Sequence, residues 1–245
     1  MMTSNKPYKL ASLLFETGSD YEQNLQALIT LIKQTDTFTI VVAPEVCLTA
    51  YDYENFEHVL AFAHLAIEEI KKISLNKIII LTMIEKRNDE IFNFAKVFHN
   101  GAVVYERAKA RLFRFGDEHK YMAEGSDEAF KIVEVDGIKL AVFICFELRF
   151  KDLWQKSEGA DVIAVPAWWG VSRREHFKLL TQSLAIINQC YVIASDSKNE
   201  ECTAMSGIIT PMGHEHRNGN TPCLELEYNK KDIALMRRYM DVGIE

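Results

Sequence analysis

Cysteine is scarce and unpatterned in this sequence. The 245 residues include five cysteines, and no two of them form a CxxC pair. An odd number without that spacing argues against a disulfide framework and against a zinc knuckle, so at least one thiol is free. His214 and His216 follow Cys202 in the sequence, but their spacing is not that of zinc ligands, and we expect no metal site.

Glycine, proline and long apolar runs are also few. With 11 glycines, 5 prolines and no Ser/Gly-rich linker, the sequence shows no boundary that would divide it, and we expect one domain over residues 1–245. No stretch reaches the roughly 18 consecutive apolar residues of a membrane-spanning helix. Residues 1–9 have neither an apolar signal core nor an arginine-rich leader, so we expect a cytoplasmic protein without membrane contact.

An excess of basic residues is missing as well. The chain has 28 basic and 35 acidic residues, a net charge of −7, and its longest basic cluster, Arg107 to Arg114, is short. Binding to a nucleic-acid backbone depends on clustered cations, so no nucleic-acid partner is expected. Neither GxGxxG nor GxxxxGK[ST] occurs, which removes the common nucleotide-binding signals. We therefore expect a protein that acts on a small molecule without a cofactor.

Apolar runs alternate with amphipathic stretches in the first third of the chain. Residues 10–15, 39–44 and 78–84 predict buried strands. A helix is expected to begin at residues 19–22, which have the spacing of a capping box. Two apolar stripes with helical spacing predict helices that face a sheet: Leu25, Leu28, Ile29 and Ile32, then Phe56, Val59, Leu60, Ala63, Ile67 and Ile70. The predicted order is βαβαβ.

The rest of the chain mixes hairpins with further strands and helices. Asn100-Gly101 and Asp136-Gly137 each separate two strand-like runs and are typical of type I′ turns. Further predicted elements are a short helix at Leu153-Trp154, strands over 161–166, 191–195 and 207–210, and a long helix marked by Phe177, Leu180, Leu184 and Ile187. Because βαβ units need helices on the sheet faces and hairpins add antiparallel strands, the predicted fold class is a layered α/β protein with mixed sheets.

Three reactive or charged residues, Glu45, Lys109 and Cys145, stand at or just beyond the ends of predicted strands. Each has an ordinary reading, because a buried cysteine is usually core, a glutamate after proline can cap an element, and a lysine near a turn is usually solvated. Together they supply a thiol nucleophile, a base to deprotonate it and a cation for a developing oxyanion. In layered α/β sheets, ligands bind at the carboxyl ends of strands, so a shared site is expected.

At these residues the sequence resembles the carbon–nitrogen hydrolase (nitrilase) superfamily. Its three signatures occur in order, and they are similar to Val41 to Tyr51, Lys109 to Phe113 with Gly116 to His119, and Ile144 to Phe150 with Gly159 to Trp168. Weaker similarity at Asn24, Asn93 and residues 206–213 extends the match over nearly the whole chain.

The resemblance implies an α/β fold, a four-layer αββα sandwich with two mixed β-sheets, assembled as a homodimer or a higher homo-oligomer. It implies that Glu45 is the base, Lys109 the oxyanion stabiliser, Cys145 the nucleophile and Glu118 an additional catalytic glutamate. The backbone N–H of Phe146 would complete the oxyanion site. The implied reaction is hydrolysis of a small-molecule amide through a thioester on the cysteine.

The segment 112–119 most resembles the bacterial ω-amidase type, which implies small α-keto-ω-amides such as α-ketoglutaramate as substrates. Guanidinium groups fit a substrate carboxylate and aromatic rings can wall a pocket, although salt bridging and core packing are equally ordinary roles. On this basis the candidate substrate-binding residues are Arg114, Arg149, Arg173, Trp168 and Trp169. The alternative activity is that of an N-carbamoyl amino-acid or β-ureidopropionase-like amidohydrolase.

The sequence departs from the family pattern around the predicted triad. Arg111 replaces the usual histidine, Phe146-Glu147 replaces Tyr-Asp, and Ala50 replaces a glycine. Leu184 and Ile187 stand where the long helix commonly carries Arg and Glu. These changes affect residues that would support the site, not the triad itself. A catalytically silent binding or scaffold protein of the same fold is the alternative from another class, and it would be indicated by a broken triad.

Overall fold

The computed structural model describes residues 7–244, and within them lie two six-stranded β-sheets. The first sheet runs in the order β12 (Cys223–Glu227), β1 (Lys9–Leu13), β2 (Thr39–Val42), β3 (Ile78–Arg87), β4 (Glu90–His99) and β5 (Ala102–Ala108). The second runs in the order β11 (Glu215–Arg217), β10 (Gly207–Ile209), β9 (Tyr191–Asp196), β8 (Val162–Ala167), β7 (Ile138–Val142) and β6 (Val133–Val135). Each sheet joins three neighbouring parallel strands to antiparallel strands on both sides.

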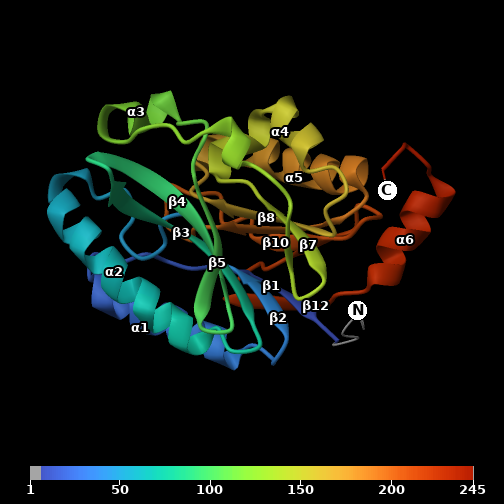
Figure 1. The fold of residues 1–245 in the computed structure, drawn as a ribbon, viewed down its shortest axis with the longest axis horizontal. Helices are drawn as coiled ribbons and strands as arrows, with labels where there is room; N and C mark the ends of the chain where they lie inside the picture. The colour runs from blue at the N-terminus through green and yellow to red at the C-terminus, as the bar shows by residue number, and fades with distance from the viewer. Residues whose placement is uncertain (1–6, 245) are drawn as a thin grey trace.

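Helices lie on both outer sides of the paired sheets and complete four layers (Figure 1). α1 (Tyr21–Gln34) and α2 (Phe56–Ile73) cover the first sheet, while α5 (Arg174–Asn188) and the short α4 (Lys151–Lys156) lie on the opposite side. α3 (Glu118–Tyr121) and α6 (Lys230–Tyr239) lie outside these layers. The predicted αββα sandwich with mixed sheets is confirmed. No helix within residues 7–244 is both long and apolar enough to cross a membrane.

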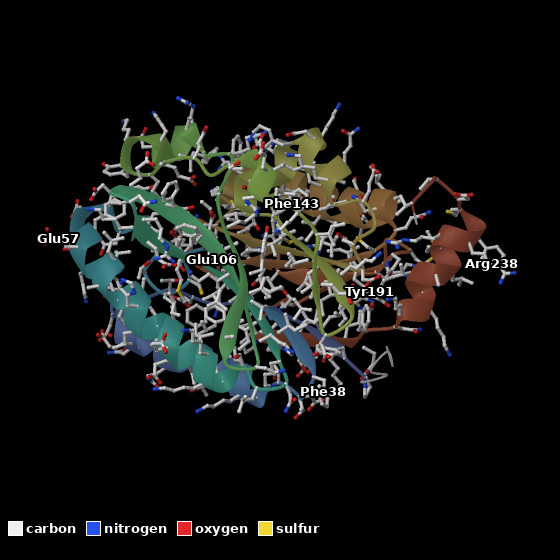
Figure 2. All side chains as sticks on the ribbon, in the orientation of Figure 1. Phe38, Glu57, Glu106, Phe143, Tyr191 and Arg238 are labelled. Atoms are coloured by element: carbon white, nitrogen blue, oxygen red, sulfur yellow. The ribbon has the colours of Figure 1, made fainter. Side chains whose placement is uncertain are left out.

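The main core fills the space between the two sheets. It joins inward-facing residues of the first sheet, such as Ile40, to residues of the second, such as Val162. Phe143 and Tyr191 lie inside the molecule and are almost fully buried, whereas Glu57 lies at its edge (Figure 2). Because the side chains of a close-packed interior cannot shift easily, the two sheets are held in place. The loops that follow their strands therefore keep fixed positions relative to one another.

Both predicted hairpin turns are present, joining β4 to β5 and β6 to β7. Asn100 and Gly101 have φ of 48° and 82°, and Asp136 and Gly137 have φ of 49° and 80°. Positive φ at both central residues is the requirement of a type I′ turn, which asparagine, aspartate and glycine meet at low cost. The β4–β5 hairpin delivers the chain to Lys109 immediately after its last strand residue.

Two details of the helices differ from the sequence-based expectation. α1 is capped by Asp20 instead of Ser19, since the Asp20 carboxylate accepts the N–H of Gln23 at 2.9 Å. In α5, Ile187 is 55% exposed, although it is one of the four apolar residues that mark the predicted helix. At 3.6 residues per turn, a position ten residues beyond Phe177 has rotated away from the sheet, and Asn188 occupies the buried face instead.

Candidate active site

The predicted catalytic residues come from loops at the strand ends of both sheets. Glu45 follows β2, Lys109 follows β5, and Glu118 opens α3. Cys145 follows β7 and begins the 3-10 turn η4 (Cys145–Arg149). Residues separated by up to a hundred positions in the sequence therefore meet because the two sheets stack face to face.

The Lys109 ammonium lies between two carboxylates. Its Nζ is 2.8 Å from Glu45 Oε1 and 2.7 Å from Glu118 Oε1, and all three side chains are almost entirely buried. An ammonium has three N–H donors, and these two contacts engage two of them at full strength. The third N–H has only a long contact, 3.5 Å, with the Tyr51 hydroxyl. It can therefore donate to an oxygen atom of a bound substrate.

Neutral donors complete the coordination of both glutamates. Asn93 Nδ2 donates to Glu45 Oε1 at 2.9 Å, and the Trp168 backbone N–H donates to Glu45 Oε2 at 3.1 Å. The Tyr51 hydroxyl donates to Glu118 Oε1 at 3.0 Å. Tyr51 and Asn93 occurred in the family-like segments, but sequence reasoning gave them no role. They could have been anticipated, because a buried carboxylate needs hydrogen-bond donors and both side chains can donate.

Burial is the largest influence on the pKa values of Glu45 and Lys109, and neighbouring charges come next. Burial raises the pKa of Glu45; the Lys109 ammonium opposes this shift and the Glu118 carboxylate adds to it. Burial alone would lower the pKa of Lys109, but Glu45 and Glu118 outweigh it, so that pKa is raised. Groups this close titrate as a unit, and the cluster holds a permanent cation beside a carboxylate that can accept a proton.

Cys145 sits in a strained position beside this cluster. Its φ of 44° lies in the left-handed region, which non-glycine residues adopt at a cost. Burial raises the pKa of the thiol, Glu45 raises it further, and Lys109 and the Trp168 N–H lower it. The thiol is thus protonated near neutral pH and depends on a neighbouring base. Among the described residues no acceptor bonds the N–H of Phe146, which leaves this donor available.

A small cavity opens at Cys145. Its lining includes four of the five predicted substrate-binding residues and the predicted oxyanion residue, and it consists of Phe113, Cys145, Phe146, Arg149, Trp168, Trp169 and Arg173. Arg114 does not reach this cavity. It lines a neighbouring groove that shares Phe113 and Phe146 with the cavity, and its role in binding substrate stays a prediction.

Two cations at the cavity have no carboxylate partner within residues 7–244. The Arg149 guanidinium lies 4.9 Å from the ring centroid of Trp169 and bonds His176 Nδ1 at 3.0 Å. The Arg173 guanidinium lies 5.1 Å from the ring of Phe113. Burial, followed by repulsion from Arg173, lowers the pKa of Arg149. The cavity can therefore attract an anion close to Cys145.

The structure shows the conformation or the contacts of several residues that depart from the family pattern. Ala50 has φ of 52°, a conformation that favours the glycine usually found there. Arg111 forms an ion pair with Asp127 and another with Asp152 at 3.0 Å. Leu184 is buried on α5. Glu147 pairs with the buried Arg107, which sequence reasoning had treated only as part of a short basic cluster.

Metal ligation has no support in the part of the chain that the structure describes. No group of three or more histidine, cysteine, aspartate or glutamate side chains is arranged to hold an ion there. All five cysteines are free thiols, and burial raises the pKa of Cys202.

Comparison with known proteins agrees with the fold and with the family that the sequence resembles. The family described as carbon-nitrogen hydrolase matches residues 9–214. A 2-oxoglutaramate amidase from Bacillus subtilis (strain 168) is 28% identical over 207 residues, which cover 80% of this chain and 79% of the relative. A deaminated glutathione amidase from Escherichia coli O157:H7 is 24% identical over 212 residues, which cover 81% of each protein.

A solved structure gives the same result for the fold. Saccharomyces cerevisiae Nit3, a member of branch 10 of the nitrilase superfamily, superposes with a TM-score of 0.84 at 21% identity. The superposition covers 100% of this chain and 98% of the yeast protein. With a family match that extends over most of its length, this chain belongs to the carbon–nitrogen hydrolase family.

Proposed function

We propose that this enzyme hydrolyses the terminal amide of a small carboxylate-bearing substrate, as an ω-amidase acting on α-keto-ω-amides. The observation that carries the proposal is that two guanidinium groups on the cavity that contains Cys145, those of Arg149 and Arg173, have no carboxylate partner within residues 7–244. A substrate of this class has an anion at one end and an amide at the other, and it therefore fits a site with cations at one side and a thiol at the other.

In the first half of the reaction, Cys145 Sγ attacks the amide carbonyl carbon while Glu45 takes the thiol proton. The tetrahedral oxyanion lies between the third N–H of Lys109 and the backbone N–H of Phe146. The carbon–nitrogen bond then breaks, and Glu45 returns the proton to the leaving nitrogen. Ammonia departs and a thioester to Cys145 remains.

In the second half, water attacks the thioester carbonyl. Glu45 accepts a proton from the water, the same two donors stabilise the second oxyanion, and the carbon–sulfur bond breaks to release the carboxylic acid. Glu118 supports this cycle because it accepts a second hydrogen bond from Lys109 and is itself held by the Tyr51 hydroxyl. The thiol then regains its proton from Glu45.

A substrate panel tests this assignment directly. Ammonia release is measured with an α-keto-ω-amide, a neutral amide of equal length and an N-carbamoyl amino acid. The proposal predicts the highest kcat/KM for the α-keto-ω-amide. Faster turnover of the carbamoyl compound, with release of carbon dioxide, would instead identify a carbamoyl amidohydrolase, and absence of turnover on all three would contradict amide hydrolysis.

Arg173 is expected to contribute to substrate binding through charge. In the Arg173→Ala variant, KM for the α-keto-ω-amide should rise about 10- to 100-fold, because a charge-assisted hydrogen bond to the carboxylate is lost. KM for the neutral amide should stay nearly constant. Arg174→Ala is the matched control, since Arg174 is the exposed neighbour that does not line the cavity. An equal rise for both substrates would refute a role in carboxylate binding.

As pH is lowered, kcat/KM should begin to fall at a pH above the ordinary pKa of a glutamate. A base works only when deprotonated, and the pKa of Glu45 is raised from its ordinary value of 4.5. The rate should therefore fall as pH decreases through this raised pKa. Measuring kcat/KM between about pH 4 and pH 9 shows the limb. A limb at or below the ordinary glutamate pKa would mean that Glu45 does not control the rate.

We further propose that the chain acts as one cytoplasmic domain, residues 1–245, assembled as a homo-oligomer. Support for one domain comes from the candidate site, which draws on loops of both sheets. Support for self-association comes from apolar side chains that α5 exposes, namely Leu179, Ile186 and Ile187. Sedimentation of the purified protein tests the oligomeric state.

A further inference from the structure

A fully buried ion pair lies beside the candidate site without belonging to it. Glu147 and Arg107 are at most 2% exposed, and the Glu147 carboxylate accepts hydrogen bonds from four donors. Two come from the Arg107 guanidinium, one of them at 2.8 Å. The others are the backbone N–H groups of Ala110 and Ile144, each at 2.7 Å.

These donors flank the two residues whose separation the reaction depends on. Arg107 and Ala110 stand on either side of Lys109, while Ile144 directly precedes Cys145. One carboxylate oxygen accepts the N–H of Ala110 and the other accepts that of Ile144. A single side chain therefore contacts the segment that carries the ammonium and the segment that carries the thiol.

Regular backbone pairing does not provide this connection. Lys109 bonds through its backbone N–H to Asn93 at 2.8 Å, within the first sheet. The segment before Cys145 bonds to β8, within the second sheet, through the N–H of Phe143 and the carbonyl of Ala164. In the described chain, every hydrogen bond between residues 107–110 and 142–147 involves the side chain of Arg107 or Glu147.

The energetics favour a geometric role for the pair. Removing two charges from water is costly, and a buried ion pair is often no more stabilising than apolar residues of the same volume. Arg107 also donates to the Val142 carbonyl at 2.6 Å, and the Glu147 carboxylate accepts the Ile144 N–H at the start of the turn in which Cys145 has its positive φ. Strain of this kind persists only where the surroundings hold it.

We propose that Glu147, together with Arg107, is a positioning residue that fixes the distance and orientation of Lys109 relative to Cys145. The inference rests on the proposed function of those two residues. A displacement of about 1 Å at a reacting centre can cost about 100-fold in rate. The pair thus acts on the reaction through Lys109 and Cys145, without touching the substrate.

The first test replaces Glu147 with glutamine, which keeps the volume but presents an N–H₂ group to donors. We expect kcat to fall about 100-fold with KM changed less than about twofold, since the cavity that binds substrate is retained. The rate of Cys145 alkylation by iodoacetamide should also shift to higher pH, because Lys109 no longer lies where it favours the thiolate. Alkylation needs no substrate, so it tests the positioning even if the proposed substrate is wrong.

Glu85→Gln is the matched control. Glu85 is likewise buried, and it pairs with the buried Lys96 at 2.6 Å. Lys96 is three residues from Asn93 on β4 and so faces away from the candidate site. The control should lose stability but keep kcat and the alkylation profile. Equal losses of kcat in both variants, or wild-type kcat in folded Glu147→Gln, would overturn the proposal.

A double variant separates folding from positioning if Glu147→Gln fails to fold. Arg107→Met combined with Glu147→Met removes both charges and keeps an apolar filling, a change that buried pairs often tolerate. We expect this protein to fold, to lose about 100-fold in kcat and to show the same alkylation shift. Wild-type kcat and alkylation in the double variant would show that the pair serves stability alone.

Discussion

Replacing Cys145 with alanine is expected to lower kcat/KM by on the order of 10⁵-fold or more, the scale seen when a covalent nucleophile is removed. Among the residues that line the cavity, Cys145 alone has a nucleophilic side chain. Without its thiol no thioester can form. The fold should be unaffected, since the change removes a single sulfur atom. Steady-state kinetics and thermal unfolding of the variant measure both effects.

Cys190→Ala is the control for this substitution. Cys190 is also a buried free thiol, but it packs in the core next to β9 and does not line the cavity. Its variant should retain turnover at a small cost in stability. If Cys145→Ala kept substantial activity, or if Cys190→Ala lost as much, Cys145 would not be the nucleophile.

Glu45→Gln should have the second largest effect, about 10²- to 10⁴-fold on acylation and on deacylation alike. Glutamine retains the shape of the side chain and can still accept from Lys109, but it cannot take a proton. Lys109 also keeps its contact with Glu118 at 2.7 Å, so the cation stays in place. Single-turnover kinetics resolve the two steps, because ammonia appears with the first and the acid with the second.

The result distinguishes a shared base from two separate ones. A loss confined to acylation would mean that another group activates the water, and Glu118 is the other carboxylate in contact with Lys109. A loss confined to deacylation would mean that the thiol is deprotonated without Glu45. Either outcome would require a different mechanism from the one proposed here.

Much of the fold was predictable because its elements carry strong local signals. Strands such as 78–84 are continuous apolar runs, and the turns at Asn100-Gly101 and Asp136-Gly137 use residues that a type I′ turn demands. The C-terminal elements β11, β12 and α6 were not predicted. β11 has three residues, and β12 is only half-buried at the edge of its sheet, so neither has a long apolar run.

The candidate site was predictable as a set of residues but not as a network. Glu45, Lys109 and Cys145 stand at strand ends, where a ligand site is expected, and family-like segments surround them. The partners that bury and orient them depend on how the two sheets stack, which strand periodicity does not specify. Arg107 illustrates this limit, because a buried arginine within a short basic cluster looks like any solvated one until Glu147 is placed beside it.

Intact-protein mass spectrometry during turnover of an α-keto-ω-amide tests the central claim most directly. In acid-quenched samples, we predict an added mass equal to the acyl group, located on the peptide that contains Cys145. The Cys145→Ala protein should acquire no such mass. An acyl group on another residue, or ammonia release by a protein that never acquires an acyl mass even in single-turnover samples, would contradict a thioester mechanism at Cys145.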